Sequence, residues 1–397
     1  MIFVKQKDLK VGMRLAKPIY DKKGVLLYER NSKLTHQGIE SVNNFGIIGL
    51  YILEPAEPVP PITDEDLLFE KFQMVSTFTI KDEWASIRDK GKAPATPTLV
   101  SQITKNYGHL DHKLNFVQSL RSQEDKYYKH ALNVAILCAL ISHKMNIPVS
   151  EQNELITAAL VHDIGKLDIP EEIRAKEDEL SDGDYDVIYK YESLGCQYLD
   201  QPFGESTGIK KIVLQAQRTM QAFRKGNADP NAKTSVGAKI LMVADKFDSS
   251  TAMNEHADPT SEITAVRHLL DHPEKYDSRV TDALIESINI LVPGCTVELT
   301  NGEKGLVITE NLRNVLKPTV LLFSDNSIID LGQELIFGNL DVKDVMKTMD
   351  NRVAVDREAM EEAFGMKNGK YEKVEKPDDL SEVGAIAESI LEALPEN

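Results

Sequence analysis

The sequence is poor in cysteine. Its 397 residues include three cysteines, Cys138, Cys196 and Cys295, and these lie far apart along the chain. Cysteines this few and this widely spaced form neither a disulfide framework nor a zinc knuckle. The sequence therefore excludes the class of small domains that are held together by disulfides.

Long apolar runs and a leader-like start are also absent. The longest uninterrupted apolar stretch covers residues 134–141, whereas a helix needs roughly 20 apolar residues to span a bilayer. Lys5, Lys7 and Asp8 interrupt the apolar residues at the start of the chain, which is unlike a signal peptide. We expect a cytoplasmic protein with no membrane insertion.

Basic residues are fewer than acidic residues. The chain has 46 Lys and Arg residues against 63 Asp and Glu residues, which gives a formal net charge of −17. Such a chain repels a polyanion on average, so we expect no DNA binding. A small phosphate ligand would need a local positive charge or a metal ion in its site.

Length and local composition predict a multi-domain, mainly α protein. A chain of 397 residues is long for one hydrophobic core, and four prolines between residues 55 and 61 are typical of an extended linker. The predicted parts are a small N-terminal α+β module (1–54), a Pro-rich linker (55–63), a helical domain (64–290), a small β unit (291–338) and an acidic helical tail (339–397).

Apolar periodicity supports these parts. In the module, strand-like runs precede a helix that Thr35 caps and that ends near residue 44, and a strand follows at 47–53. Apolar patterns of helical period predict the helices of the middle domain at 129–145, 151–161, 184–199, 207–223, 235–248 and 261–270. Asn301-Gly302 predicts a hairpin between strands at 296–300 and 305–309, followed by strands at 319–323 and 327–331. In the tail, amphipathic helices are predicted at 342–364 and 380–394, as a solvated appendage or a surface for a protein partner.

Four polar residues in apolar surroundings predict a metal site. His162 and Asp163 end an apolar helix, His130 opens a buried helix and Asp245 closes an apolar run. A buried carboxylate is costly unless it is paired or bound to a metal, and imidazole with carboxylate is a ligand set that Fe, Mn or Zn accepts. Lys166 lies about one turn further on, where its ammonium could meet a phosphate. We also expect Gly165 to end the helix in the left-handed conformation.

Each of these residues also has an ordinary structural explanation. A single buried histidine is usually a core residue with its hydrogen bonds satisfied, and a His-Asp pair often arises by chance. The order, spacing and apolar context of His130, His162, Asp163 and Asp245 together favour a metal site.

The sequence resembles the HD-GYP branch of the HD metal-dependent phosphohydrolases. The resemblance rests on His130, on residues 159–170 (ALVHDIGKLDIP) and on residues 242–248 (MVADKFD), and it extends over most of residues 1–340. It implies an all-helical HD-type domain with His130, His162, Asp163 and Asp245 as metal ligands. Active members of the family hydrolyse cyclic diguanylate with two or three metal ions, usually iron or manganese.

The later part of the family pattern is missing. Tyr191 stands where the family has a further ligand histidine, and Ala216, Gln217 and Arg218 stand where it has a His-His-Glu cluster. Residues 219–234 contain no Gly-Tyr-Pro, and no histidine occurs between His162 and His256. Carboxylates at Glu192 or Glu205 offer only a partial substitute, so we expect one ion, Fe or Mn.

A basic stretch replaces the missing cluster. It contains Arg218 among five lysines and arginines between residues 210 and 225. Because arginine recognises phosphate bidentately, Arg218 and Lys166 are candidate phosphate-binding residues. The alternative is a solvated helix face.

Three functions remain open at this point. The first is a degenerate HD-GYP protein of cyclic diguanylate signalling, whose phosphodiesterase activity is weak or lost and whose role is regulatory or ligand-binding. The second is an active single-metal hydrolase of a nucleotide or cyclic diguanylate, in which Asp163 and Lys166 act in catalysis. The third is a non-catalytic adaptor that binds proteins.

Overall fold

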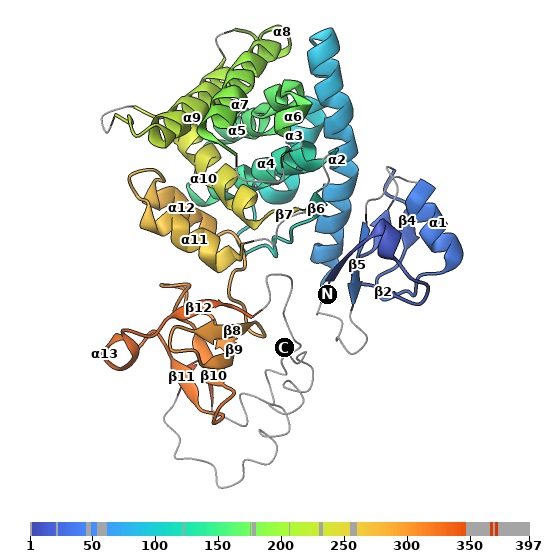
Figure 1. Ribbon diagram of the computed structural model, residues 1–397. Helices are drawn as coiled ribbons and strands as arrows, with labels where there is room; N and C mark the ends of the chain where they lie inside the picture. The colour runs from blue at the N-terminus through green and yellow to red at the C-terminus, as the bar shows by residue number, and fades with distance from the viewer. Residues whose placement is uncertain are drawn as a thin grey trace. The chain divides into compact units, whose positions relative to one another are not determined.

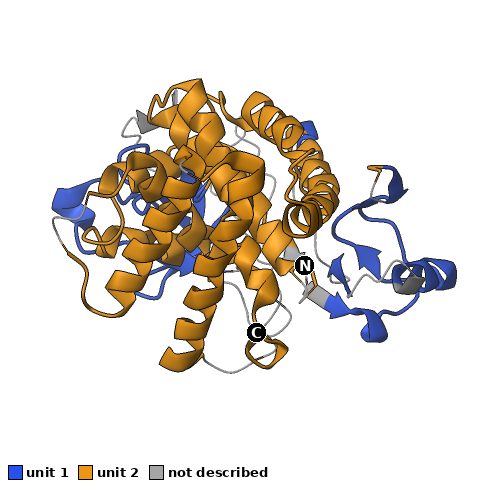
Figure 2. Cartoon of the chain, turned by 90° about the horizontal axis from the view of Figure 1, so that it is seen from above, with its two compact units in different colours: residues 1–21, 25–64, 290–397 blue, residues 22–24, 65–289 orange. Residues whose placement is uncertain are grey.

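The structure is a computed structural model, and it describes residues 2–20, 23–44, 49–53, 62–121, 124–174, 176, 180–205, 207–229, 233–254, 260–346, 366–367 and 370–371. The chain forms two compact units (Figure 2): one comprises residues 1–21, 25–64 and 290–397, and the other residues 22–24 and 65–289. Among the described helices, none is long and apolar enough to cross a membrane.

The N-terminal part is a small mixed α and β structure. An antiparallel sheet has the order β1 (Ile2–Lys5), β5 (Gly49–Leu53), β2 (Arg14–Leu15). A second antiparallel pair, β3 (Ile19–Tyr20) and β4 (Leu26–Tyr28), precedes α1 (His36–Asn44). The predicted cap of α1 is confirmed, because the Thr35 hydroxyl accepts a hydrogen bond from the Gly38 amide at 3.0 Å.

A five-stranded antiparallel sheet follows the helices. Its order is β11 (Ile328–Asp330), β10 (Thr319–Leu322), β9 (Lys304–Thr309), β8 (Thr296–Leu299) and β12 (Val342–Val345), and the short helix α13 (Glu334–Phe337) precedes β12. The predicted hairpin between β8 and β9 is confirmed, with Gly302 at φ +87°.

The prediction of a helix at 342–364 is wrong for the first residues of that range. Val342–Val345 is the strand β12, which pairs with β8 and extends the sheet beyond residue 338. Val342 is completely buried there, so its apolar side chain completes a sheet rather than a helix face. Residues 347–365 and the helix predicted at 380–394 lie outside the described residues, and within the tail the structure describes β13 (Met366–Lys367) and β14 (Lys370–Tyr371).

The other unit is helical (Figure 1). Its α-helices are α2 (Asp64–Lys90), α3 (Thr96–Tyr107), α4 (Lys126–Lys144), α5 (Val149–Val161), α6 (Glu171–Arg174), α7 (Asp182–Gly195), α8 (Asp200–Phe203), α9 (Gly208–Arg224), α10 (Val236–Thr251), α11 (Glu262–Asp271) and α12 (Ser278–Ile285). Two 3-10 helices, η2 (Ile164–Asp168) and η3 (Cys196–Leu199), and a two-residue parallel pair, β6 (Leu120–Arg121) with β7 (Met253–Asn254), complete it. The predicted fold class, mainly α with a small C-terminal sheet, is confirmed.

Helix α4 forms the centre of the helical unit. Every residue from Ala131 to Ser142 is buried, as its apolar residues on all sides predict, and α5 and α10 pack against it. Trp84 on α2 is 1% exposed, and its indole N–H donates to the Leu160 carbonyl oxygen at 2.8 Å. The buried core thus brings the N-terminal end of α4 close to the C-terminal end of α5.

Candidate metal centre

Three helices bring the predicted ligands together. His130 comes from α4, His162 is the C-terminal cap of α5, and Asp245 comes from α10. One ligand atom from each lies within 4.8 Å of the others. Asp163 adjoins them, with Oδ2 at 3.6 Å from His130 Nε2 and Oδ1 at 3.4 Å from His162 Nε2. All four residues that the sequence singled out therefore meet at one point.

The Nε2 atom of His162 is free to accept a cation. Its Nδ1 lies 2.7 Å from the Ala159 carbonyl oxygen, and because a carbonyl only accepts, Nδ1 carries the proton and Nε2 carries a lone pair. Nε2 is buried and has no hydrogen-bond partner among the described residues. Burial lowers the pKa of the ring, which keeps it neutral. An unpartnered lone pair facing two carboxylates fits a metal ion.

A buried network orients His130. Its Nδ1 lies 2.6 Å from Asp248 Oδ2, and its Nε2 lies 2.9 Å from Asp245 Oδ1. Burial would lower the pKa of His130, but the hydrogen bonds to Asp245 and Asp248 outweigh it and raise the pKa to about 9. A metal ion at Nε2 must therefore displace a proton.

Asp248, which contacts His130, is fixed by several hydrogen bonds. It is fully buried, and Arg121 donates to its two oxygens at 2.7 and 2.6 Å. Gln118 and Asn133 each donate to Oδ1 at 2.9 Å. Burial would raise the pKa of Asp248, but Arg121 and His130 hold it at about 2. The sequence analysis missed this role, although a second aspartate one turn after Asp245 on a buried helix was a usable signal.

Lys166 lies beside the ligands. Its ammonium is 2.7 Å from Asp163 Oδ2 and 3.2 Å from Glu192 Oε1. Burial opposes the charged form of Lys166, but the two carboxylates outweigh it and raise the pKa of the amine well above its ordinary value. Glu192, a candidate replacement ligand, thus contacts Lys166, and Glu205 is exposed in the loop between α8 and α9.

Helix α9 carries the residues that stand in place of the missing His-His-Glu cluster, and it contacts the site through the side chain of Gln217. The Gln217 amide donates to the His162 carbonyl oxygen at 3.2 Å and accepts from the Cys196 thiol at 3.5 Å. Ala216 is buried and Arg218 is exposed. Three other basic residues of this stretch pair with carboxylates: Lys210 with Asp200, and Arg224 and Lys225 with Asp186. These pairings favour a solvated helix face over a phosphate-binding surface, and a phosphate contact by Arg218 stays a prediction.

Gly165 permits close packing rather than a left-handed helix end. The expectation of positive φ is wrong, because Gly165 is not among the described glycines with positive φ and lies within η2. A Cβ on Gly165 would lie 2.2 Å from the Tyr191 carbonyl oxygen and 2.9 Å from the Gly195 Cα. Two glycines in contact thus let η2 and α7 approach, which brings Lys166 to Glu192.

Gly165→Ala should therefore destabilise the helical unit by about 1–3 kcal/mol, the usual cost of overpacking. The measurement is denaturant unfolding followed by the fluorescence of Trp84, the single tryptophan of the chain. Gly183→Ala is the matched control, since a Cβ on Gly183 in α7 meets its nearest atom at 3.8 Å. Equal stability of the two variants would contradict the packing role of Gly165.

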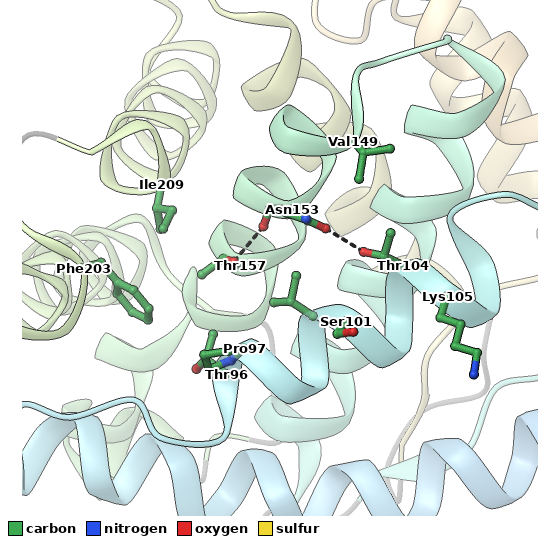
Figure 3. Close-up of a pocket in the computed structure, with 11 residues that line it drawn as sticks. Thr96, Pro97, Ser101, Thr104, Lys105, Val149, Asn153, Thr157, Phe203 and Ile209 are labelled. Carbon is green, nitrogen blue, oxygen red and sulfur yellow. Dashed lines mark hydrogen bonds between the residues drawn. The ribbon is translucent and has the colours of Figure 1, made fainter.

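A separate cavity opens elsewhere in the helical unit (Figure 3). It has a volume of about 640 Å³, and its lining includes Thr96, Lys105, Asn153 and Phe203. Thr104 donates to Asn153 across it at 2.8 Å. None of the metal-site residues lines it, and Lys105 is the one charged residue among the lining residues, so the cavity is separate from the candidate metal site.

Known proteins and one family model match the part of the chain that contains the candidate metal site. A family model for the HD domain matches residues 115–280. Cyclic di-GMP phosphodiesterase PA4108 of Pseudomonas aeruginosa is 22% identical over 60% of this chain and 58% of its own length. 3'3'-cGAMP-specific phosphodiesterase 1 of Vibrio cholerae is 26% identical over 40% of this chain and 37% of its own length. Cyclic di-GMP phosphodiesterase PdeB of Borreliella burgdorferi is 21% identical over 52% of this chain and 54% of its own length.

These matches define the class of the protein. Residues 115–280 contain every predicted ligand and match the HD-domain family model, and the similarity of the chain to these phosphodiesterases supports membership of the HD-GYP family. It spans less than two thirds of the length of these relatives. A solved structure of Bd1817, a HDG"Y"P protein from Bdellovibrio bacteriovorus, aligns with 71% of this chain and 97% of that chain at 13% identity and a TM-score of 0.42, a similarity too low to support a conclusion.

Proposed function

We propose that this chain is a degenerate HD-GYP protein of cyclic-dinucleotide signalling, with weak or lost phosphodiesterase activity and a regulatory or ligand-binding role. One observation carries the proposal: His130, His162 and Asp245 converge within 4.8 Å, while α9 has Ala216, Gln217 and Arg218 in place of a His-His-Glu cluster and reaches the site through Gln217. We infer that the site offers the ligands for one divalent ion, Fe or Mn, and lacks the imidazoles for a second.

The ligand class follows from chemistry and from the relatives. The curated relatives are named for cyclic di-GMP or 3'3'-cGAMP, whose phosphodiesters carry negative charge. In a chain of net charge −17, such a ligand needs local positive charge. A divalent ion held by His130, His162, Asp163 and Asp245, together with the Lys166 ammonium, supplies it.

The residues of the chain have separate tasks in this account. The Ala159 carbonyl fixes the tautomer of His162, and Asp248 fixes the orientation of His130. Lys166 keeps its charge because Asp163 and Glu192 both contact it. A bound divalent ion supplies Lewis-acid stabilisation of charge on a phosphoryl group. The two-metal clamp on attacking and leaving oxygens has no counterpart in these residues.

The test is an assay of cyclic di-GMP binding and hydrolysis by the full chain loaded with Mn²⁺. We expect measurable binding and a kcat below about 0.01 s⁻¹, against the about 1–10³ s⁻¹ of ordinary enzymes. His162→Ala should remove both the binding and any residual turnover. A kcat in the ordinary range that is lost in His162→Ala would instead establish the active single-metal hydrolase.

The second candidate function, that single-metal hydrolase, is favoured by the Lys166 ammonium, which lies 2.7 Å from Asp163 Oδ2. The third function, a non-catalytic adaptor, gives no reason for Lys166 and the four candidate ligands to occur together. The finding that the chain binds neither a metal ion nor a cyclic dinucleotide would support the adaptor. The acidic tail at 339–397 is the segment we propose for a protein partner in either case.

A further inference from the structure

Two lysines lie beside the metal site without a carboxylate partner. Lys246 follows Asp245 on α10, and Lys275 lies in the segment between α11 and α12, two helices that both pack against α10. Both side chains are half-buried. Neither ammonium forms a hydrogen bond or an ion pair with any residue that the structure describes. In a chain of net charge −17, two lysines left unpaired are available to an anionic ligand.

Electrostatic effects place the two lysines close to each other. Burial lowers the pKa of Lys275, and the nearby charge of Lys246 lowers it further. Asp245 acts in the opposite direction, so Lys275 also lies near the metal site. Burial lowers the pKa of His268 on α11, and the charges of Lys246 and Lys275 both add to that effect. Two like charges gathered in this way repel each other, and a bound anion relieves the repulsion.

Aromatic packing fixes the position of Lys275. Its ammonium lies over the ring of Tyr276, 5.3 Å from the ring centre, and Tyr276 is 1% exposed. The ring of His268 has its centre 6.0 Å from that of Tyr276 and 4.4 Å from that of His272. A cation held over a ring face keeps its positive charge. The Lys275 ammonium is therefore held in place without being neutralised.

A third lysine on α10 has a partner instead. Lys239 donates to Asp277 Oδ2 at 2.9 Å, and Arg279 donates to the same oxygen at 3.0 Å. Asp277 lies two residues after Lys275 in the chain, yet its carboxylate is engaged by these two other cations. The absence of a partner thus distinguishes Lys246 and Lys275 from a lysine of the same helix.

We propose that Lys246 and Lys275 form a phosphate-binding pair, which holds a phosphate group of the cyclic dinucleotide on the Asp245 side of the metal site. The inference rests on the proposed function and extends it, because that function takes its positive charge from the metal ion and Lys166 alone. An ammonium is a compact cation with three donors. Two such groups donate charge-assisted hydrogen bonds to separate oxygens of one phosphate.

Replacement of either lysine by glutamine should weaken binding of the dinucleotide and leave binding of the metal unchanged. In the full chain loaded with Mn²⁺, we expect Lys246→Gln and Lys275→Gln each to raise the dissociation constant of cyclic di-GMP by about 10-fold, the effect of one lost hydrogen bond to a charged group. The double variant should bind more weakly than either single variant. Isothermal titration calorimetry measures the dinucleotide, and electron paramagnetic resonance of the free ion measures Mn²⁺ affinity.

Two controls separate a phosphate contact from the loss of a lysine in general. Lys239→Gln removes a lysine of α10 that is 34% exposed and paired with Asp277, and it should leave both affinities unchanged. Lys275→Arg keeps the positive charge and should lose less affinity for cyclic di-GMP than Lys275→Gln. Circular dichroism verifies that each variant is folded, and the two single variants decide the outcome if the double variant is not.

The outcomes distinguish this inference from the function on which it rests. Weaker cyclic di-GMP binding with unchanged Mn²⁺ affinity in both single variants supports both. Wild-type dinucleotide affinity in either variant, or an equal loss of Mn²⁺ affinity, overturns the phosphate-binding pair and leaves the proposed function standing. A wild-type chain that binds Mn²⁺ but no cyclic di-GMP overturns the inference and the proposed function together.

Discussion

Asp248→Ala should destabilise the helical unit by about 3–5 kcal/mol, because it leaves a buried charge without its partner. Arg121 is 4% exposed and loses both of its bonds to the carboxylate. Gln118 and Asn133 lose an acceptor at the same time. The fluorescence of buried Trp84 reports the unfolding of this unit in a denaturant titration.

The matched control is Asp271→Ala, at the exposed end of α11. It should change the free energy of unfolding by no more than about 0.5 kcal/mol. A loss below about 1 kcal/mol in Asp248→Ala, the size of a surface ion pair, would contradict the account of Asp248 as the anchor of His130.

His162→Ala should weaken Mn²⁺ binding by at least about 100-fold. Loss of a residue that only supports a ligand costs about 10–100-fold in metal affinity, and His162 Nε2 is itself the unpartnered ligand atom. Affinity is measured by Mn²⁺ titration, with Trp84 fluorescence to show that the variant is folded.

His272→Ala provides the comparison for this variant. His272 Nδ1 lies 2.8 Å from the His268 carbonyl oxygen, close to the 2.7 Å between His162 Nδ1 and the Ala159 oxygen. It lies outside the metal-ligating group, so its removal should leave Mn²⁺ affinity unchanged. If both variants bind Mn²⁺ like the wild type, His162 is a core histidine and not a ligand.

Much of this architecture is predictable from the sequence because it depends on local patterns. The apolar residues on all sides of α4 predict its burial, and Asn301-Gly302 predicts the β8–β9 hairpin. The four candidate ligands were recognisable because their order, spacing and apolar context occur together, although each of them alone has an ordinary structural explanation. His130, His162 and Asp245 form one group that could hold a metal ion, and Asp163 Oδ2 lies 3.6 Å from His130 Nε2.

The remainder depends on contacts between distant segments. Arg121 and Asp248 are separated by 127 positions, so their ion pair has no local pattern. Glu192 meets Lys166 only because Gly165 and Gly195 allow η2 and α7 to touch. Strand β12 was predicted as the start of a helix because the apolar pattern of a few residues is compatible with a helix or a strand. Its pairing with β8, which is more than 40 residues earlier in the chain, decides between them.

The most direct test is the metal content per chain of the wild-type protein, purified without chelator and without oxygen. The account predicts about one Fe or Mn per chain, retained through desalting. No metal after incubation with Fe²⁺ and Mn²⁺ would contradict the metal centre. Two or three ions per chain would contradict the claim that the loss of the later histidines restricts the site to one ion.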